Sequence, residues 1–220
     1  MRKVTVLTVL GLLSLTLLWA GLAKPTPKVQ ADPTWQVVTI PGLPAGAIPA
    51  GLWSSAPNDV YVSAYMPTDV PQGFVFRWDG TSWSQVLSLP GHSTSKIFGT
   101  GPLDVYALAY RCAAGQAAGC GADRGGQIFR STDGGGTWTP LVLPPEVGVN
   151  GLNDISGTAG NVHVLVGDDS RIIRFDGSNW TTVFTGGTDA SGKPWALTLL
   201  SPTEGYFVTC WGWGKWNGAS

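Results

Sequence analysis

The hydrophobic and polar positions of this chain form a pattern that recurs at long intervals. Three segments each contain an apolar run with one arginine, an Asp-Gly turn, and a tryptophan that opens a second run: GFVFRWDGTSWSQV (73–86), GQIFRSTDGGGTWTPL (126–141) and SRIIRFDGSNWTTV (170–183). Short apolar runs separated by Gly, Asp and Asn are typical of two strands joined by a tight turn. A fourth copy, GWGKWNGAS (212–220), ends one residue before its tryptophan would follow.

A second pattern precedes each of these segments and also predicts two strands. Its copies are GLWSSAPNDVYVSAY (51–65), KIFGTGPLDVYALAY (96–110), GLNDISGTAGNVHVLVG (151–167) and ALTLLSPTEGYFVTCWG (196–212). Each copy has an apolar run, a turn rich in Pro, Gly, Asn and Asp, and another apolar run. The repeating unit is therefore four strands within about 41–54 residues.

Repeats of this length with four antiparallel strands are typical of β-propeller blades. We therefore predict an all-β fold, a β-propeller of four-stranded antiparallel blades, in a domain spanning residues 32–220. The expected blades cover roughly residues 51–87, 96–143, 151–184 and 196–220. The fourth blade needs an outer strand, and TWQVV (34–38) has the form of one. Two interpretations stay open: a four-bladed ring completed by this segment, or a fragment of a larger propeller, which the abrupt end of the sequence favours.

The segment STDGGGTW (131–138) contains the residue types of a phosphate loop, a metal site or a turn. A phosphate loop requires a helix to follow it, and TWTPLVLPP does not have a helical pattern. Glycines permit the positive backbone torsions of a tight turn, and an aspartate can accept hydrogen bonds from the same turn. We therefore predict a turn between a third and a fourth strand, with the tryptophan packed between blades.

This segment resembles the Asp-box, or BNR, repeat motif of the form Ser/Thr-x-Asp-x-Gly-x-Thr-Trp. The matching residues are Ser131, Asp133, Gly135, Thr137 and Trp138, and degenerate versions contain Asp79, Gly80 and Trp83, and Asp176, Gly177 and Trp180. From about residue 35 onward the chain is similar to exported bacterial repeat proteins of the sialidase-like and sortilin-like propeller group. The resemblance implies that the Asp boxes are structural and lie away from any catalytic centre.

The resemblance also defines an enzymatic alternative. Retaining sialidases have an arginine triad, a tyrosine nucleophile, an acidic partner and an Arg-Ile-Pro segment, and no Arg-Ile-Pro occurs in this sequence. Arg77, Arg130 and Arg174 occupy equivalent repeat positions, which favours repeated packing over a carboxylate clamp. Endoglucanase-like Asp-box enzymes need two carboxylates in a cleft, and the sequence does not place such a pair. A glycoside hydrolase with an incomplete or unrecognised site is the alternative to a non-enzymatic protein.

The N-terminal residues 1–31 predict export. Arg2 and Lys3 precede the uncharged run from Val4 to Ala23, which has the form of a signal peptide and is long enough for an uncleaved membrane anchor. We expect cleavage, because small residues and prolines follow the run. Loss of this segment leaves nine basic and 14 acidic residues, a net charge of −5. A mildly acidic surface argues against nucleic acid and anionic lipid as partners. We therefore expect contact with a membrane only if the N-terminal segment stays uncleaved.

The three cysteines suggest one disulfide and one free thiol. Cys112 and Cys120 are eight residues apart in a Gly- and Ala-rich loop, and in an exported protein we expect them to pair. Neither histidine lies at zinc-ligand spacing from them, so we expect no metal and no cofactor. Cys210 is expected to be a buried thiol.

Connection lengths indicate where a ligand would bind. The turns APND, GPLD, DGTS, DGGGT and DGSN would open on one face, and they are short. The connections MPTDVPQ, RCAAGQAAGCGADRG, SLPGHSTSK, LPPEVGVN and TGGTDASGKPW would open on the other face, and they are longer. Binding residues usually lie on elaborated loops of a rigid scaffold. The candidate binding residues are Arg111, Asp123, Arg124, Asp168, Asp169, Lys193 and Trp195, and the expected partner is a protein or a glycan.

Overall fold

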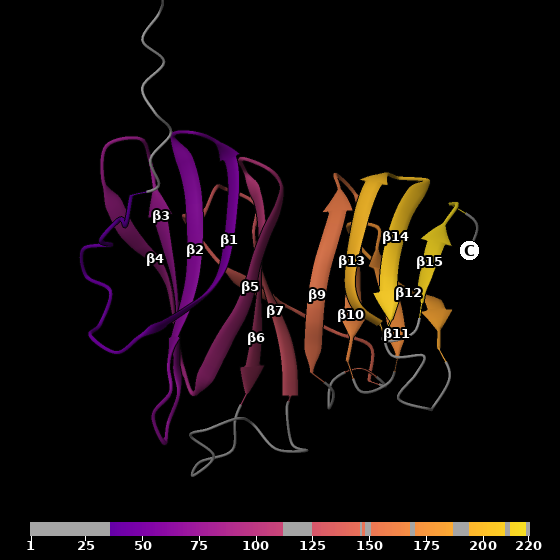
Figure 1. The fold of residues 1–220 in the computed structure, drawn as a ribbon, viewed down its shortest axis with the longest axis horizontal. Coiled ribbons are helices and arrows are strands. Elements are labelled where there is room, and N and C mark those ends of the chain that lie inside the picture. Colours follow the sequence, from indigo (N-terminus) through magenta and orange to yellow (C-terminus); the bar gives the residue numbers. More distant parts are fainter. Residues whose placement is uncertain are drawn as a thin grey trace, which may run out of the picture. The chain divides into compact units, whose positions relative to one another are not determined.

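A computed structural model describes residues 36–111, 125–145, 147, 151–167, 170–186, 194–209 and 212–218. Its folded unit begins at Thr39. Within these ranges every regular element is a β-strand, and the strands form four antiparallel sheets in chain order (Figure 1). These sheets confirm the prediction of an all-β propeller built from antiparallel blades.

Three sheets have four strands, and the described part of the fourth has three. The first contains β1 (Ile48–Ala56), β2 (Asp59–Met66), β3 (Gln72–Trp78) and β4 (Trp83–Pro90). The second contains β5 (His92–Gly101), β6 (Asp104–Arg111), β7 (Gly125–Ser131) and β8 (Thr139–Leu141). The third contains β9 (Leu152–Thr158), β10 (Asn161–Val166), β11 (Arg171–Phe175) and β12 (Trp180–Thr185). The fourth contains β13 (Pro194–Ser201), β14 (Glu204–Thr209) and β15 (Trp213–Trp216).

The second strand of each of the first three sheets is buried on both faces, which explains its nearly continuous apolar sequence. In β2, Tyr61 and Ser63 point to one face while Val62 and Ala64 point to the other, and all four are buried. In β6 the residues Val105–Ala109 are all buried. A sheet that faces water on one side would alternate apolar and polar residues instead.

The sheets pack face to face through their first strands and through three apolar clusters. β1 packs against β5, β5 against β9, and β9 against β13, so the sheets follow one another side by side (Figure 1). The first cluster joins sheets one and two around Tyr61 and Ala107, and the second joins sheets two and three around Tyr106 and Val164. The third is smaller and joins sheets three and four around Leu165. Burial of these faces is what the repeated apolar pattern encodes.

The connection between the first two blades differs from the sequence expectation. The segment SLPGHSTSK was expected to be a long loop, but β4 ends at Pro90 and β5 begins at His92. Gly91 has a φ of 75°, a left-handed conformation that glycine adopts without steric cost and that allows a one-residue reversal. The polar residues from His92 to Ser95 are instead part of a strand: His92, Ser93 and Thr94 pair with β6, and Ser95 lies at a bulge in this pairing.

The N-terminal predictions fall mostly outside the described residues. Residues 1–31, the expected signal peptide, are among those not described. In the proposed closing segment, Gln36, Val37 and Val38 have no strand conformation and are exposed. Among the described residues, no helix has the length and apolar character needed to cross a bilayer.

Candidate functional site

A polar cleft lies between the first two sheets, beside the end of β4, the start of β5 and the end of β6. Its volume is about 330 Å³. It is lined by Asp69, Val70, Pro90, Gly91, His92, Arg111 and Gln127. These residues come from the β2–β3 loop, the β4–β5 reversal and the adjoining ends of β6 and β7. The cleft is therefore on the face that the connection lengths indicated.

Strand pairing brings its two basic side chains together. Arg111 is the last residue of β6, it is exposed, and it pairs in register with His92 at the start of β5. On its other side Arg111 pairs with Gly125 of β7. A glycine there places no side chain beside the arginine on the neighbouring strand.

The ring of His92 is held in a fixed orientation. Its Nδ1 lies 3.0 Å from the carbonyl oxygen of Pro90, and its Nε2 lies 3.0 Å from the side-chain oxygen of Gln127. The ring also packs edge-on against Phe129, with centroids 6.0 Å apart. On the opposite rim, the hydroxyl of Thr68 donates to the carbonyl of Val70 and stabilises the loop that carries Asp69.

Of the seven predicted binding residues, Arg111 lies in this cleft. Trp195 is on β13 of the fourth sheet, is 58% exposed, and does not line the cleft. The other five, Asp123, Arg124, Asp168, Asp169 and Lys193, lie outside the described residues, as do Cys112 and Cys120. Those predictions stay predictions.

Sequence reasoning missed Asp69, His92 and Gln127. Asp69 lies in a connection already recognised as long, and repeat alignment puts it on the same face as Arg111. His92 also lies in a segment, SLPGHSTSK, that was expected to be a long connection on this face, whereas Gln127 carried no such signal because it was assigned to a strand interior. Asp69 is the single carboxylate among the described residues lining the cleft, whereas glycoside hydrolysis requires two.

The STDGGGTW segment forms a tight turn between β7 and β8. Oδ1 of Asp133 accepts hydrogen bonds from the Ser131 hydroxyl at 2.7 Å and the Thr137 backbone N–H at 2.9 Å. Oδ2 accepts from the Thr137 hydroxyl at 2.8 Å. These donors lower the pKa of Asp133 to about 2, because they favour the carboxylate. Gly134 and Gly135 have φ values of 70° and 88°, which this turn requires.

The degenerate motifs have the same local function. Asp79 accepts hydrogen bonds from two backbone N–H groups of its own turn, those of Thr81 and Ser82, both at 2.8 Å. Asp176 does the same with the N–H groups of Ser178 at 2.8 Å and Asn179 at 2.7 Å. Each motif aspartate is thus occupied by its own turn and does not face the cleft residues.

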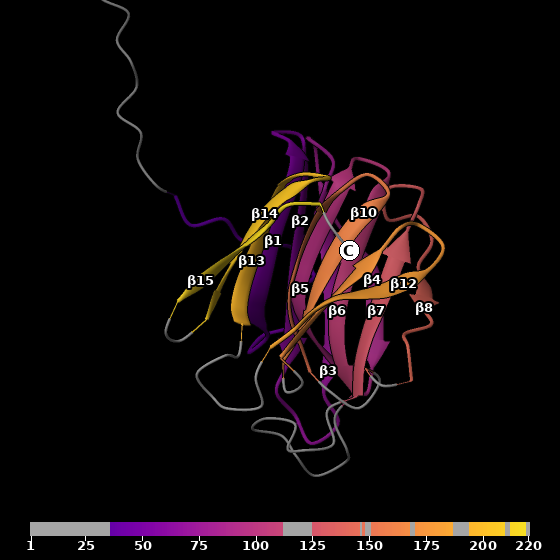
Figure 2. The same ribbon diagram turned by 90° about the vertical axis from the view of Figure 1, so that its right-hand side faces the viewer.

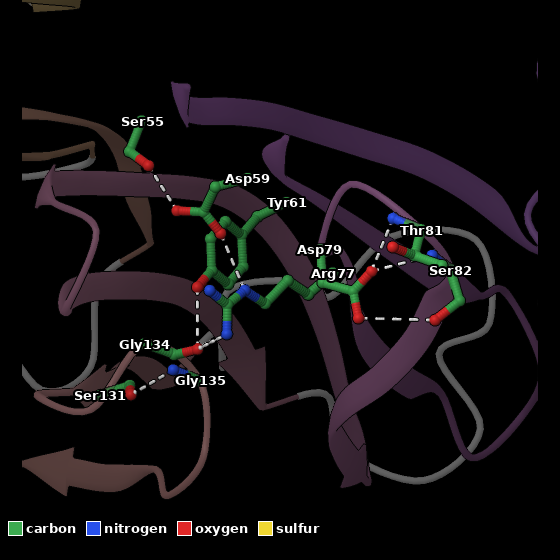
Figure 3. Close-up of polar contacts among 10 residues, drawn as sticks. All are labelled: Ser55, Asp59, Tyr61, Arg77, Asp79, Thr81, Ser82, Ser131, Gly134 and Gly135. Atoms are coloured by element: carbon green, nitrogen blue, oxygen red, sulfur yellow. Dashed lines mark hydrogen bonds and ion pairs between the residues drawn. The ribbon is translucent and has the colours of Figure 1, made fainter. Parts of the chain in front are cut away.

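The repeated arginine Arg77 takes part in a partly buried cluster that joins the first blade to the second (Figure 3). Arg77 Nε donates to Asp59 at 2.8 Å, and its guanidinium lies over the Tyr61 ring at 5.4 Å. Both the Tyr61 hydroxyl and Arg77 Nη1 donate to the carbonyl of Gly134 in the next blade, at 2.9 and 2.8 Å. Burial is the main cause that raises the pKa of Tyr61 to about 12, so the phenol stays protonated as a donor.

Equivalent clusters recur in the second and fourth sheets. Arg130 pairs with Asp104 at 2.7 Å and lies over the Tyr106 ring at 5.4 Å. In the fourth sheet a lysine replaces the arginine, and Lys215, Glu204 and Tyr206 form the cluster. Periodic packing therefore accounts for these basic residues, and no site that binds a carboxylate needs to be invoked.

The third sheet departs from this pattern. Asn161 and His163 replace the acid and the tyrosine, so Arg174 lacks the acidic partner of its equivalents. The Asn161 side chain donates to the carbonyl of Pro202 at 3.0 Å instead. His163 is 2% exposed, and neither of its ring nitrogens has a hydrogen-bond partner among the described residues. Burial and the nearby charge of Arg174 lower its pKa to about 4, so the ring is neutral at pH 7.

Among the described residues, no group of three or more His, Cys, Asp or Glu side chains is placed to hold a metal ion.

No family model matches the sequence, and no protein with a curated description is similar to it in sequence. Solved β-propeller structures are similar in fold. YCF48 from Cyanidioschyzon merolae superposes with a TM-score of 0.55 at 14% identity, covering 81% of this chain and 56% of that one. The computationally designed Ika4 protein superposes with a TM-score of 0.55 at 14% identity, covering 84% of this chain and 99% of that one. A luciferin-regenerating enzyme superposes with a TM-score of 0.52 at 13% identity, covering 78% of this chain and 58% of that one.

The likeness to these structures establishes the propeller fold alone. This chain spans little more than half the length of the YCF48 chain.

Proposed function

We propose that this chain is an exported Asp-box β-propeller that binds a protein partner or a glycan, without catalysing a reaction. The observation that carries the proposal is the cleft of Asp69, His92, Arg111 and Gln127. Its side chains offer both hydrogen-bond donors and acceptors, and they are positioned by paired strands rather than by loops alone. Export is supported by the basic and apolar N-terminal segment, and the Asp-box assignment by the hydrogen bonding around Asp133.

Arg111 is the residue whose removal tests the proposal. A charge-assisted hydrogen bond from a guanidinium contributes about 1.5–3 kcal/mol, so its loss weakens binding at least about tenfold. The wild-type protein is screened on a glycan array and on a library of extended peptides, which separates the two partner classes. The strongest hit is then titrated against wild type and Arg111→Ala.

Arg171→Ala is the matched control. Arg171 is the first residue of β11 in the third sheet and lies at the same end of its blade as Arg111 does in the second. Its removal changes the net charge by the same amount as Arg111→Ala and leaves the cleft intact. We expect Arg171→Ala to bind like wild type. Equal affinity of wild type and Arg111→Ala would refute the cleft as the binding site. Hydrolysis of chromogenic glycosides by the purified protein would refute the non-enzymatic assignment.

A further inference from the structure

The carboxylate of Asp69 differs from every other acidic side chain that the structure describes. The others each hold an ion pair or accept hydrogen bonds, namely Asp59, Asp79, Asp104, Asp133, Asp154, Asp176 and Glu204. Asp69 is exposed and makes neither kind of contact within the described ranges. It lines the cleft between the first two sheets, so a ligand there meets a carboxylate that has no protein partner.

The guanidinium of Arg111, which the second sheet contributes to the same cleft, is also unpaired. Among the described basic residues, Arg77, Lys96, Arg130 and Lys215 each form an ion pair with an acid. Arg111 forms none with any residue of the described chain, Asp69 included. The cleft therefore contains two opposite charges that do not neutralise each other.

The other two polar side chains of the cleft already have partners. The ring nitrogens of His92 lie 3.0 Å from the carbonyl oxygen of Pro90 and 3.0 Å from the side-chain oxygen of Gln127. A ligand gains most from groups whose hydrogen-bonding capacity is not yet used, because it then displaces only water from them. The two charges are therefore the main determinants of which ligand fits.

A close approach of the two sheets fixes the position of the basic group. A Cβ atom at Gly73 of β3 would lie 2.7 Å from Cγ2 of Thr94 and 3.1 Å from its backbone nitrogen, so a glycine is required for this approach. The Thr94 hydroxyl also donates a hydrogen bond to the carbonyl of Ala64 on β2. These contacts attach the start of β5 to the first sheet, and Arg111 pairs there with His92. The arginine is thus held at a defined place relative to the sheet that carries the acidic side of the cleft.

The rim of the cleft is open to the surface of a macromolecule. The β2–β3 connection lies at the same lower end of the folded unit as the end of β6 and the start of β7 (Figure 1 and Figure 2). Asp69 and Arg111 are exposed there, and Val70 is 61% exposed and can contact the aliphatic part of a long side chain. The lining residues described for the cleft include no Phe, Tyr or Trp ring against which a sugar ring would stack. These features favour a charged polypeptide over a neutral glycan.

From these observations we propose that the cleft binds a polypeptide segment carrying one acidic and one basic side chain, its carboxylate paired with Arg111 and its cationic group with Asp69. This inference rests on the proposed function, because it names the partner class of the same cleft. Arginine binds carboxylates with defined, often bidentate geometry, which orients the segment. A ligand with one charge would cover the opposite charge of the cleft without pairing it, so charge complementarity selects the partner.

The test uses blocked Gly-Ser peptides that contain one glutamate and one lysine at different separations. Binding to the full chain is followed by NMR chemical shifts, which also detect weak complexes. We expect one separation to give saturable shifts of the His92 ring signals, with those of His163 unchanged. Replacing the peptide glutamate by glutamine should weaken binding at least about tenfold. Replacing the lysine by norleucine should weaken it about threefold, because an exposed ion pair with a flexible partner contributes less.

Protein variants assign each charge of the peptide to its partner. Arg111→Gln should weaken binding of the original peptide and leave that of the glutamine peptide unchanged, and Asp69→Asn should do the same with the norleucine peptide. Arg171→Gln is the matched control and should bind like wild type. The peptide substitutions need no protein variant, so they decide the question even if a variant does not fold.

The outcomes separate this inference from the proposed function. No binding at any separation, or equal binding of the doubly charged peptide and a peptide with the glutamate alone, would overturn the inference. A glycan or an uncharged peptide that binds wild type and loses affinity in Arg111→Ala would also overturn it, while the proposed function would stand. Binding of the charged peptide that neither Arg111→Gln nor Asp69→Asn weakens would contradict both, because the cleft would not be the site.

Discussion

Replacing His163 should make the free energy of unfolding less sensitive to acid, because this buried histidine has a lowered pKa in the folded chain. In the folded chain its pKa is about 4, against an ordinary value of 6.5. Below pH 6.5 the unfolded state therefore binds a proton that the folded state does not bind until the pH nears 4. The contribution of His163 to the free energy of unfolding is therefore largest above pH 6.5 and falls as the pH drops to about 4. Below that pH this contribution no longer changes. A difference of about 2.5 pKa units corresponds to about 3 kcal/mol.

The groups that face His163 determine this expectation. Arg174 on β11 adds positive charge, while Lys215 on β15 is paired with Glu204 of β14. Aspartates such as Asp133 also lose stabilising charge in acid, but only below about pH 4. The comparison of wild type with His163→Phe isolates the histidine, because the phenylalanine has a similar size and does not titrate.

Urea denaturation of both proteins at intervals from pH 4 to pH 7.5 measures the effect. We expect the free energy of unfolding of wild type to fall by about 3 kcal/mol more than that of His163→Phe across this range. His92→Gln serves as a control, and it should keep the wild-type slope. Parallel curves for wild type and His163→Phe would refute the reasoning, since they would mean that His163 is protonated in the fold or solvated.

Three further predictions concern the turn, the buried clusters and the cysteines. Asp133→Ala should lower the melting temperature, because the turn residues Ser131 and Thr137 lose their common acceptor, while ligand affinity stays unchanged. A selective loss of binding would contradict a structural function. Arg77→Met should cost roughly 1–3 kcal/mol in urea denaturation, since it leaves the buried Asp59 carboxylate without its strongest donor. An effect below measurement would show that the cluster does not join the blades. Cys112 and Cys120 should appear as one linked peptide in mass spectra of non-reduced digests of exported protein, and two free thiols would contradict the pairing.

Much of the fold could be predicted because the repeat carries independent signals. The strands β2 and β6 begin with the same Asp-Val-Tyr and are mostly apolar, which follows from burial on both faces. The turns could be assigned because Gly80, Gly134 and Gly177 have φ values that other residues adopt only with strain. The short reversal at Gly91 was missed, because the polar residues that follow it do not resemble a strand.

The candidate site was predicted only in part. Arg111 could be selected from its place at the end of a strand before a long loop. His92 and Gln127 could not, because their function depends on which strands pair beside Arg111, and a strand's own sequence does not encode its neighbours.

The sequence by itself determined the blade architecture, the structural nature of the motif aspartates and the face with elaborated connections. Each of these features depends on residues close together in the sequence, and each recurs in several copies of the repeat. Only the tertiary structure revealed the polar cleft between the first two blades and the burial of His163 between the third and fourth. Both depend on side chains from different blades meeting in space. The histidine is distinctive because burial and Arg174 act on it together.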